Sequence, residues 1–500
     1  MLQFDKNFNF IDFRTVKSKL RYGRNMMRLL LINPSNSVKG LGNVSATAFP
    51  PLNLPYIAAL TPSHYQIDVI DENVEPFEFR DADIVGLTAY TASVHRAYEI
   101  AQLYREKGIP TVIGGIHASM LPDEASQYCD VVAVGEAESI WPEIIRDFEN
   151  KRLKKIYRGE MIDLKNLPIP RRDILKNAYY KWGSIQTSRG CPNNCSFCSV
   201  TAFNGRKFRR RPLHSVMEEL ETIPQKYIMI TDDNLAGYHQ EDREWAKSFF
   251  RMIIEKKIKK LFFIQASIQF GEDTELLRLA SKAGVKIALV GMESVNPKTL
   301  KSYKKNINLK HMKANNCHTL ISNIRKAGIL FLGTFVIGGD EDDISSFHTT
   351  LDFIQSSHID ILQFTKLTPL PGTALWNSLK KQNRLLDLKY PEAWKDYRFT
   401  KILYKPLKMS ITDIDEGNFY MKKIYFSFRE TLKRTFFTLM TTKSILTTII
   451  AFKFNQSYKK SFVTSDRYPL FDKPDFKKRF EKTSPFAKLK TRRYHIVTGL

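Results

Sequence analysis

The chain has 500 residues, of which 77 are Lys or Arg and 52 are Asp or Glu, so its formal net charge is +25. It holds only five cysteines, too few for a disulfide framework in so long a chain. The start MLQFDKNFNFIDF carries Asp5 and Asp12 where a signal peptide needs an apolar core, so we expect a cytoplasmic protein. The basic excess favours an anionic partner, but no recognised nucleic-acid module accompanies it, which argues against nucleic acid.

After a polar extension at residues 1–26, strand-like and helix-like runs alternate over residues 27–150. Short apolar runs at 27–35 and 66–73 predict buried strands, and three longer runs each begin as a strand and continue toward a helix, at 82–108, 110–119 and 129–148. This alternation predicts a doubly wound, Rossmann-like α/β domain whose ligand lies at the carboxyl ends of its strands. None of the turns is a GxGxxG, so a dinucleotide site lacks its fingerprint.

Residues 151–181 form a basic, proline-bearing stretch, which we interpret as a linker. Beyond it the alternation resumes over residues 182–385. Six strand-like runs, separated by helical stretches such as 215–223, 273–284 and 343–357, predict six βα units in a parallel sheet or barrel, whose strand ends carry the chemistry. The six runs lie at 182–190, 226–234, 260–268, 285–294, 329–339 and 359–367.

Three cysteines stand in the spacing CxxxCxxC within SRGCPNNCSFCSV: Cys191, Cys195 and Cys198. A structural zinc site needs four ligands, and a ferredoxin-type cubane takes four thiolates, so three thiolates leave one metal corner open. An open corner indicates a catalytic iron–sulfur cluster that binds a substrate or cofactor there. The alternatives are a zinc site with His214 as its fourth ligand and accidental clustering, while Cys129 and Cys317 lie far away in the sequence.

This cysteine loop, with Phe197 before the last cysteine and the strand-like WGSIQTSRG before the first, resembles the cluster loop of radical S-adenosylmethionine (SAM) enzymes. The resemblance implies a partial (β/α)6 barrel and a [4Fe-4S] cluster whose open iron is chelated by SAM, which is then cleaved to a 5'-deoxyadenosyl radical. No literal Gly-Gly-Glu follows the second strand, which departs from the family pattern. The SAM contacts that the resemblance implies at the strand ends are Asp232, Asp233, Asn234, Ser267, Glu293 and Gly338.

The turns LTAYTAS, GGIHASMLPDEA and VGEAES resemble the cobalamin-binding domain that precedes the barrel in one branch of this family, and TPLPGTALW matches a loop of the same branch. The DxHxxG whose His ligates cobalt in many cobalamin proteins is absent, so we expect cobalamin bound without its own base on cobalt. His117 has a turn-stabilising hydrogen bond as its alternative role. The implied cobalamin contacts are Thr88, Ala89, Ser93, Gly114, Gly115, His117, Gly135 and Glu136.

Residues 386–500 predict a basic, mainly helical region, in which 401–500 hold 22 Lys and Arg against 8 Asp and Glu. The apolar run 435–452 is interrupted by Lys443 and by threonines, so it falls short of a membrane-spanning segment. It predicts either an interfacial helix on an anionic membrane or a solvated basic helix packed on the barrel. The smaller cluster GRKFRRRP, at 205–212, suggests docking of an acidic flavodoxin or ferredoxin, an arginine that holds the SAM carboxylate, or a solvated loop.

The resemblance thus implies a cobalamin-dependent radical SAM enzyme that methylates an unactivated carbon through methylcobalamin and a 5'-deoxyadenosyl radical. A lipid or a secondary metabolite is the expected substrate, with a peptide or small antibiotic precursor as the alternative. Two other functions stay open: a cyclase or ring-rearranging enzyme with the same cofactors but no methyl transfer, and a cobalamin-binding sensor. A methylthiotransferase is disfavoured because only Cys129 precedes the barrel, whereas that branch needs a second cysteine cluster there.

Overall fold

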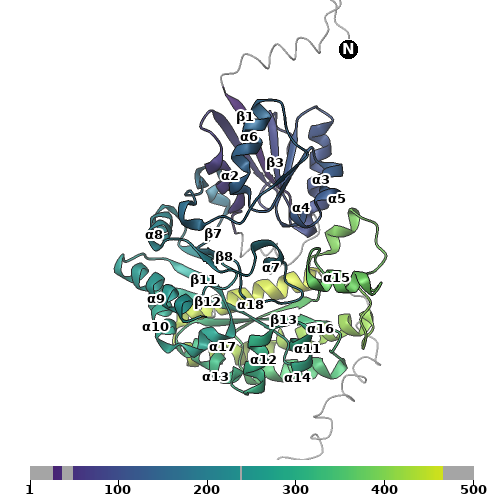
Figure 1. The fold of residues 1–500 in the computed structure, drawn as a ribbon. Coiled ribbons are helices and arrows are strands. Elements are labelled where there is room, and N and C mark those ends of the chain that lie inside the picture. The colour runs from purple at the N-terminus through teal and green to yellow at the C-terminus, as the bar shows by residue number, and fades with distance from the viewer. Residues whose placement is uncertain (1–25, 37–48, 237–238, 466–500) are drawn as a thin grey trace, which may run out of the picture.

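The computed structural model describes residues 26–36, 49–236 and 239–465, so the predicted N-terminal extension lies almost wholly outside the described residues, as does the end of the basic tail. Two α/β units stand one above the other (Figure 1). The upper unit holds a parallel sheet of six strands in the order β2-β1-β3-β4-β5-β6. The strands are β1 (Met27–Asn33), β2 (Tyr65–Asp71), β3 (Ile84–Thr88), β4 (Thr111–Gly114), β5 (Val131–Val134) and β6 (Ile156–Arg158).

Helices cover both faces of this sheet, which is why its central strands are apolar on both sides. On one face α2 (Asn53–Leu60) and α6 (Trp141–Glu149) pack against alternate strand residues such as Leu29 and Leu31. On the other face α3 (Val94–Arg105) and α5 (Pro122–Tyr128) pack against Leu30 and Ile32. The predicted doubly wound fold is confirmed, and the strand order reverses direction between β1 and β3.

The structure differs from the sequence prediction at residues 151–181. We interpreted this segment as a linker, but Ile156–Arg158 pairs with Val132–Val134 as the sixth strand of the upper sheet. Tyr157 in this strand is buried among the residues of α6. The strand is only three residues long and lies in a run of Lys and Arg, so no periodicity marked it.

The lower unit holds a second parallel sheet of six strands in the order β14-β13-β12-β11-β10-β7, which confirms the six predicted βα units. A small antiparallel pair, β8 (Ser188–Arg189) and β9 (Arg209–Arg210), closes the cysteine loop. The six strands are β7 (Trp182–Ile185), β10 (Tyr227–Ile230), β11 (Leu261–Ala266), β12 (Val285–Glu293), β13 (Leu330–Ile337) and β14 (Ile361–Lys366).

One face of this sheet carries the helices that connect successive strands. Phe262 and Ile264 of β11, for example, point into a core shared with these helices. Other helices of the lower unit lie at the edge of the sheet where the strands end. The helices are α7 (Ser199–Asn204), α8 (Leu213–Thr222), α9 (Gln240–Glu255), α10 (Thr274–Ala283), α11 (Pro297–Ser302), α12 (Asn306–Lys313), α13 (Cys317–Lys326), α14 (Ile344–Ser356), α15 (Ala374–Lys381) and α16 (Ile411–Tyr425).

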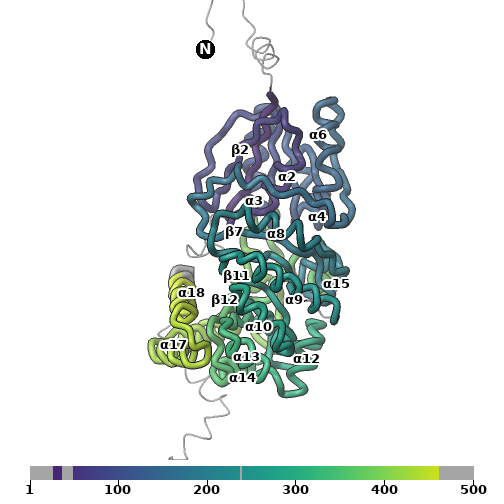
Figure 2. The backbone as a smooth tube through the Cα atoms, turned by 90° about the vertical axis from the view of Figure 1, so that its left-hand side faces the viewer, coloured from purple at the N-terminus to yellow at the C-terminus, as the bar shows by residue number. Residues whose placement is uncertain are grey.

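The opposite face of the sheet is covered by the C-terminal helix α18 (Ile445–Ser465). Ala451 and Phe454 pack against Trp182 and Phe263 of the sheet. The sheet residues on this face alternate along their strands with those that face the connecting helices. Figure 2 shows α17 (Phe428–Thr442) and α18 on the side of the sheet away from α9 and α10. The predicted apolar run 435–452 is therefore two helices, separated at Lys443, whose φ of 51° is left-handed.

Among the described residues, no helix has both the length and the apolar character that a membrane span requires.

The two units meet at the carboxyl ends of their strands, and a segment after the barrel ties them together. The short helix α4 (Ile116–Met120), which follows β4, contacts α7, which follows the cysteines (Figure 1). A short 3-10 turn at Glu392–Asp396 places Trp394 in the core of the upper unit, where its Nε1 donates to Glu124. The ligand-facing edges of the two sheets therefore face each other.

Candidate functional site

The three cysteines of the CxxxCxxC motif lie in the loop between β8 and α7. Cys191 and Cys195 are buried and Cys198 is half-buried. The backbone holds this loop at several points: the amide of Cys191 donates to the Gly205 carbonyl, and the amide of Ser196 donates to the Tyr303 carbonyl. Burial raises the pKa of all three thiols, that of Cys198 to about 12. A metal must therefore displace protons from these thiols when it binds.

Lys305, in the turn between α11 and α12, faces the cysteine loop. Its ammonium group lowers the pKa of all three thiols, against the larger effect of burial. Its Nζ also lies 3.1 Å from Oε1 of Glu293 at the end of β12. Sequence analysis named Glu293 but missed Lys305, because no local motif marks this lysine and only the fold brings it to the cysteines.

The donor set of three cysteines in one loop fits the ligand count of an iron–sulfur cluster that leaves one iron corner open, because each thiolate of a cubane binds a different iron atom. Among the described residues, no group of three or more His, Cys, Asp or Glu side chains is arranged around a single ion. His214, the alternative zinc ligand, lies exposed at the start of α8. The three thiols and the nearby Lys305 thus suit a cluster that needs compensation of its negative charge.

Two of the residues predicted to contact SAM carry buried polar atoms without a hydrogen-bond partner. These are the side-chain nitrogen of Asn234, after β10, and the hydroxyl of Ser267, after β11. The two residues are neighbours, since the Ser267 amide donates to Asn234 Oδ1 over 3.1 Å. Buried polar groups are rarely left unpaired in native proteins, so a polar ligand at this edge would satisfy both. This observation fits SAM at the predicted place.

The paired aspartates after β10 have separate environments. Asp232 is fully buried and its carboxylate accepts from the backbone and hydroxyl of Thr187 and from the hydroxyl of Ser188. Burial raises the pKa of Asp232. Its oxygens thus hold the strand that leads to the cysteines, and the predicted contact of Asp232 with SAM stays a prediction. Burial also raises the pKa of Asp233, to about 6, and its Oδ2 accepts from Asn204, which leaves it nearer to the cysteine loop.

Glu293 and Gly338, the other two predicted SAM contacts, both have positive φ at the strand ends. Glu293 has a φ of 62°, which is uncommon for a residue other than glycine, and it is buried beside Lys305. Gly338 has a φ of 98°, and its carbonyl accepts from the Tyr404 hydroxyl. The structure thus places both at the edge of the barrel that holds the cysteines.

Two predicted cobalamin contacts in the upper unit have protein partners, and their contact with cobalamin stays a prediction. His117 is buried, and its Nδ1 and Nε2 lie 3.3 Å from the Thr91 hydroxyl and 3.2 Å from Glu124. These contacts are the ones expected of the turn-stabilising alternative. Glu136 is also buried, and its carboxylate accepts from Arg209 of β9 and from the Ile162 amide. Glu136 therefore joins the two units.

The small residues predicted to admit the corrin are also required by the protein's own backbone. A Cβ on Gly115, whose φ is 97°, would lie 2.9 Å from the Ala89 carbonyl oxygen. A Cβ on Gly135, whose φ is 88°, would lie 2.5 Å from the Gly159 carbonyl oxygen. Gly114 is half-buried with only ordinary contacts, whereas Thr88, Ala89 and Ser93 are buried. The turns are therefore built from close backbone approaches that leave little side-chain bulk at the edge.

Sequence analysis missed Tyr90, which lies between the buried Ala89 and Thr91 in the turn after β3. Tyr90 is 69% exposed, although protein surrounds it closely enough that desolvation raises the pKa of its hydroxyl. The carboxylate of Asp233, in the lower unit, raises this pKa further. Tyr90 is therefore accessible and lies close enough to Asp233 of the lower unit for the two groups to interact electrostatically. The signal in the sequence was an aromatic residue among small ones in LTAYTAS.

Most arginines of the basic cluster at 205–212 form ion pairs within the protein. Arg209 pairs with Glu136, Arg210 with Asp242, and Arg211 with Glu219. These three guanidinium groups hold the structure together, so they leave Arg206 and Lys207 as the exposed cations of the cluster.

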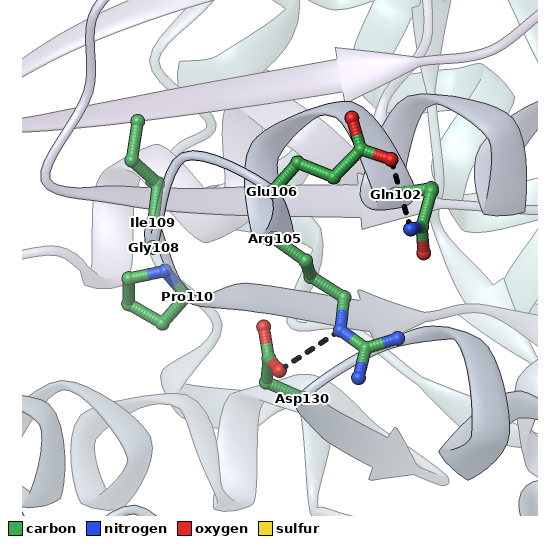
Figure 3. Close-up of a pocket in the computed structure, with 7 residues that line it drawn as sticks. All are labelled: Gln102, Arg105, Glu106, Gly108, Ile109, Pro110 and Asp130. Atoms are coloured by element: carbon green, nitrogen blue, oxygen red, sulfur yellow. Dashed lines mark hydrogen bonds and ion pairs between the residues drawn. The ribbon is translucent and has the colours of Figure 1, made fainter.

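A hollow of about 510 Å³ lies in the upper unit, away from the cysteines. It is lined by Gln102, Arg105 and Gly108 at the end of α3 and by Pro110 and Asp130, which precede β4 and β5 (Figure 3). Arg105 and Asp130 form an ion pair of 3.1 Å there. Because the hollow lies at the amino ends of the strands, it is at the wrong edge of the sheet for the expected ligand.

The carboxyl edge of the upper sheet faces the cysteine loop of the lower unit. This arrangement is typical of two-domain α/β metalloenzymes in which one domain holds a metal cluster and the other a second cofactor. Family models divide the chain in the same way. Residues 38–145 match the B12 binding domain, and residues 185–354 match the radical SAM superfamily. The chain thus combines a B12 binding domain with a radical SAM domain, and this pair of domains accounts for cobalamin, SAM and a [4Fe-4S] cluster as its cofactors.

Known proteins resemble the chain over most of its length. The bacteriochlorophyllide d C-12(1)-methyltransferase of Chlorobaculum tepidum is 29% identical over 76% of this chain and 83% of its own length. The hopanoid C-2 methylase of Rhodopseudomonas palustris is 26% identical over 68% of this chain and 66% of its own. The anaerobic magnesium-protoporphyrin IX monomethyl ester cyclase of Cereibacter sphaeroides is 24% identical over 80% and 72%.

Solved structures share the fold. The radical SAM methyltransferase TsrM of Kitasatospora setae, solved with cobalamin and a [4Fe-4S] cluster, aligns with a TM-score of 0.58 at 18% identity, over 71% of this chain and 75% of its own. The cobalamin-dependent radical SAM enzyme OxsB, solved with aqua-cobalamin and SAM, aligns with a TM-score of 0.65 at 14% identity, over 93% and 75%. These likenesses support the two-unit architecture.

Proposed function

We propose that the protein methylates an unactivated carbon of a polycyclic lipid or secondary metabolite. One observation carries this proposal: the ligand edge of the B12-binding unit faces the cysteine loop of the radical SAM unit, with α4 against α7 and Glu136 paired to Arg209. Two reactive groups would therefore stand on opposite sides of one space. The relatives named for methylating a bacteriochlorophyllide and a hopanoid support the choice of reaction and of a polycyclic substrate.

When bound, the cluster with SAM supplies one-electron cleavage chemistry, and the cobalamin supplies a metal centre that carries a methyl group. The chain's own residues hold and orient these groups. Cys191, Cys195 and Cys198 would bind the cluster after losing their protons, and Lys305 offsets the resulting negative charge. Asn234 and Ser267 would direct their unpaired polar atoms to SAM.

The other residues of the site act by position. Asp232 fixes Thr187 and Ser188, and so fixes the strand that leads into the cysteine loop. Tyr90 lies at the space between the units, where it would limit how closely substrate and solvent approach the cobalamin edge. His117 would hold the turn at the edge of the B12-binding unit through Thr91 and Glu124, and would not serve as a cobalt ligand while it keeps these contacts.

A cyclase with the same cofactors is the second candidate, because the cyclase relative covers 80% of this chain. For either reaction we propose an acidic flavodoxin or ferredoxin as the electron donor. Arg206 and Lys207 support this proposal, since both are exposed just after α7 and next to the cysteine loop. Long-range attraction between such cations and an acidic partner speeds association and weakens with salt.

The test uses anaerobically reconstituted protein with cobalamin, a reductant and SAM carrying a deuterated methyl group. Extracts of a strain that lacks the gene serve as the substrate source. We expect one extract component to gain a labelled methyl group while 5'-deoxyadenosine accumulates. Cys195→Ala should abolish both products, whereas Cys317→Ala, which changes a buried cysteine of α13, should retain them.

The alternatives give different results. A component that changes mass without gaining label, together with 5'-deoxyadenosine, would identify a cyclase or ring-rearranging enzyme. Binding of cobalamin with no SAM cleavage under any reducing condition would favour the sensor and contradict an enzymatic role.

A further inference from the structure

The C-terminal hairpin, which we define as α17 and α18 (428–465), has an inverted distribution of polar and apolar residues. Its buried side is mostly polar: Arg434, Thr438 and Thr442 on α17, and Thr447 and Asn455 on α18. In an ordinary surface helix the buried side is apolar. The inversion shows that the hairpin does not attach to the barrel through apolar packing alone.

Hydrogen bonds to the loop before β14 anchor this polar side. The Thr438 hydroxyl donates to the carboxylate of Asp360 over 2.7 Å, and the Asn455 side chain donates to the Asp360 carbonyl over 2.8 Å. Arg325 of α13 pairs with the same carboxylate. Asp360 is fully buried, so these contacts fix the hairpin rigidly on the barrel.

The outward side of the hairpin is apolar. Residues on this side recur at spacings of three and four, as in 432, 436 and 439 or 445, 449 and 452, so they form one face on each helix. Exposed apolar side chains gathered in this way on neighbouring helices mark interaction sites. The outer face of the hairpin, with each residue 39–77% exposed, consists of Phe428, Leu432, Phe436, Leu439, Met440, Ile445, Leu446, Ile449 and Phe452.

Positive charge borders this outer face. Arg429, Lys433, Lys443, Lys453 and Lys459 are exposed on the hairpin, and Glu430 is its only acidic residue between 428 and 465. Lys453 follows Ile449 by four residues, and Lys459 follows Phe452 by seven, so the apolar face continues along α18 as a basic one. Apolar side chains beside Lys and Arg are the composition of helices that lie in the interface of an anionic bilayer.

We propose that the outer face of the hairpin docks the enzyme on the surface of an anionic phospholipid bilayer, with the apolar side chains inserted among the acyl chains and the lysines among the headgroups. The contact is peripheral, in keeping with the lack of a spanning helix among the described residues. It stands apart from the proposed methyl transfer, because the hairpin covers the barrel face opposite the connecting helices and contains none of the predicted cofactor contacts.

Charge decides between a bilayer and a second copy of the chain as the occupant. In a symmetric dimer the same surface patch meets itself, so the bordering lysines and arginines of the two copies would lie opposite one another. Such juxtaposition of like charges is costly. Phospholipid headgroups instead neutralise these cations, while the bilayer buries the apolar side chains.

The experiment measures cosedimentation of the full-length, reconstituted protein with vesicles of phosphatidylcholine alone and of phosphatidylcholine with phosphatidylglycerol in equal parts. We expect binding to the mixed vesicles that weakens with added salt. The double variant Phe436→Ser/Ile449→Ser should lower the partition coefficient about tenfold or more, because each side chain loses most of its transfer from water. The charge variant Lys453→Glu/Lys459→Glu should also lower the partition coefficient, and the decrease should be larger for the mixed vesicles than for phosphatidylcholine alone.

Matched controls use exposed residues elsewhere: Leu103→Ser on α3 for the apolar change and Lys282→Glu on α10 for the charge change. Both should bind like the unchanged protein, and every variant should retain its cluster absorbance. Absence of binding to mixed vesicles at low salt would overturn the proposal. Sedimentation velocity that instead shows a dimer, lost in Phe436→Ser/Ile449→Ser without any vesicle binding, would overturn it in favour of a second copy.

Discussion

At the scale of single residues, the contacts of His117 match the turn-stabilising alternative to its predicted contact with cobalamin. Its ring nitrogens lie near Thr91 and Glu124, and its ring packs edge-on against Trp394 with centroids 4.9 Å apart. Glu124 in turn accepts from Trp394 Nε1 over 3.0 Å. A side chain with both nitrogens engaged and no exposed surface cannot reach a metal in the space between the units without breaking these contacts.

We therefore predict that the cob(II)alamin form of the protein shows no nitrogen hyperfine splitting from a protein imidazole in electron paramagnetic resonance. His117→Gln keeps a polar side chain for Thr91 and should leave the cobalt spectrum unchanged. Thermal unfolding of the same variant supplies a control that the substitution has a structural effect. Nitrogen splitting in the unchanged protein that disappears in His117→Gln would mean that this histidine does ligate cobalt.

Asp342, in the turn after β13, carries a pH dependence of stability. Burial raises its pKa from 3.8 to about 6, while hydrogen bonds from Thr299 and Gly339 oppose the rise. Because the folded state binds this proton more tightly than the unfolded state, the stabilisation is fully present below pH 3.8 and is lost as the pH rises through about 6.

Asp342→Asn imitates the protonated carboxyl, so the variant should gain stability relative to the unchanged protein as the pH rises from about 4 to about 7. The gain has an upper limit of about 3 kcal/mol, which is the size of the pKa shift expressed as free energy. Unfolding midpoints of both proteins across this pH range measure it. A difference that stays constant with pH would show that Asp342 does not titrate in this range.

At the scale of elements, periodicity predicted nearly every strand of both sheets, because buried parallel strands are continuous apolar runs with turns at both ends. It missed β6, which is three residues long in a basic stretch. The three cysteines could be proposed as cluster ligands from the sequence because they lie in one short loop. Lys305 could not be proposed from the sequence, since it reaches the cysteine loop from a distant turn. Tyr90 could not be proposed either, since it differs from its buried neighbours only in its exposure.

Sequence patterns also could not separate the two interpretations of the C-terminal helices. In the structure the largely polar side of these helices packs on the barrel and the apolar side faces outward, while contact with a membrane stays a prediction. The threonines that interrupt the apolar run 435–452 include Thr438 and Thr447, which lie on the buried side. Hydropathy alone would place such residues outside.

We predict that Asp360→Asn releases this hairpin. The change leaves the buried Arg325 without its carboxylate and weakens the bond from Thr438, so it should lower the unfolding free energy by about 3 kcal/mol or more. Hydrogen exchange should accelerate in α17 and α18 before it does in β11 or β12. Glu341→Gln, which breaks the exposed pair with Lys408, is the matched control and should change stability by less than about 1 kcal/mol. Equal exchange in all elements would argue against a separately anchored hairpin.

At the scale of the whole molecule, the two units are joined by ion pairs and by the packing of Trp394. Arg209 and Arg189 of the lower unit both pair with Glu136 of the upper unit, and Arg189 also pairs with Glu138. Trp394 extends from the segment after the barrel into the upper core. These contacts border the space between the two ligand edges, so they set the distance at which the proposed cofactors would face each other.

The last prediction concerns Glu136, which holds this arrangement from the upper side. Burial raises its pKa, but the hydrogen bond from Arg209 and the charge of Arg189 lower it more, so the net pKa is below the ordinary value. Glu136→Gln removes the charge and leaves two arginines in a buried site, which typically costs about 3–5 kcal/mol when one partner of a buried pair is lost. We expect a lower first unfolding transition and faster proteolysis of the connection between the units. The control Glu143→Gln, on α6, breaks an exposed ion pair with Lys154 and should leave both measurements nearly unchanged. If the two variants behave alike, the ion pairs do not hold the units together, and the packing of Trp394 must carry the interface, which Trp394→Phe would then reveal.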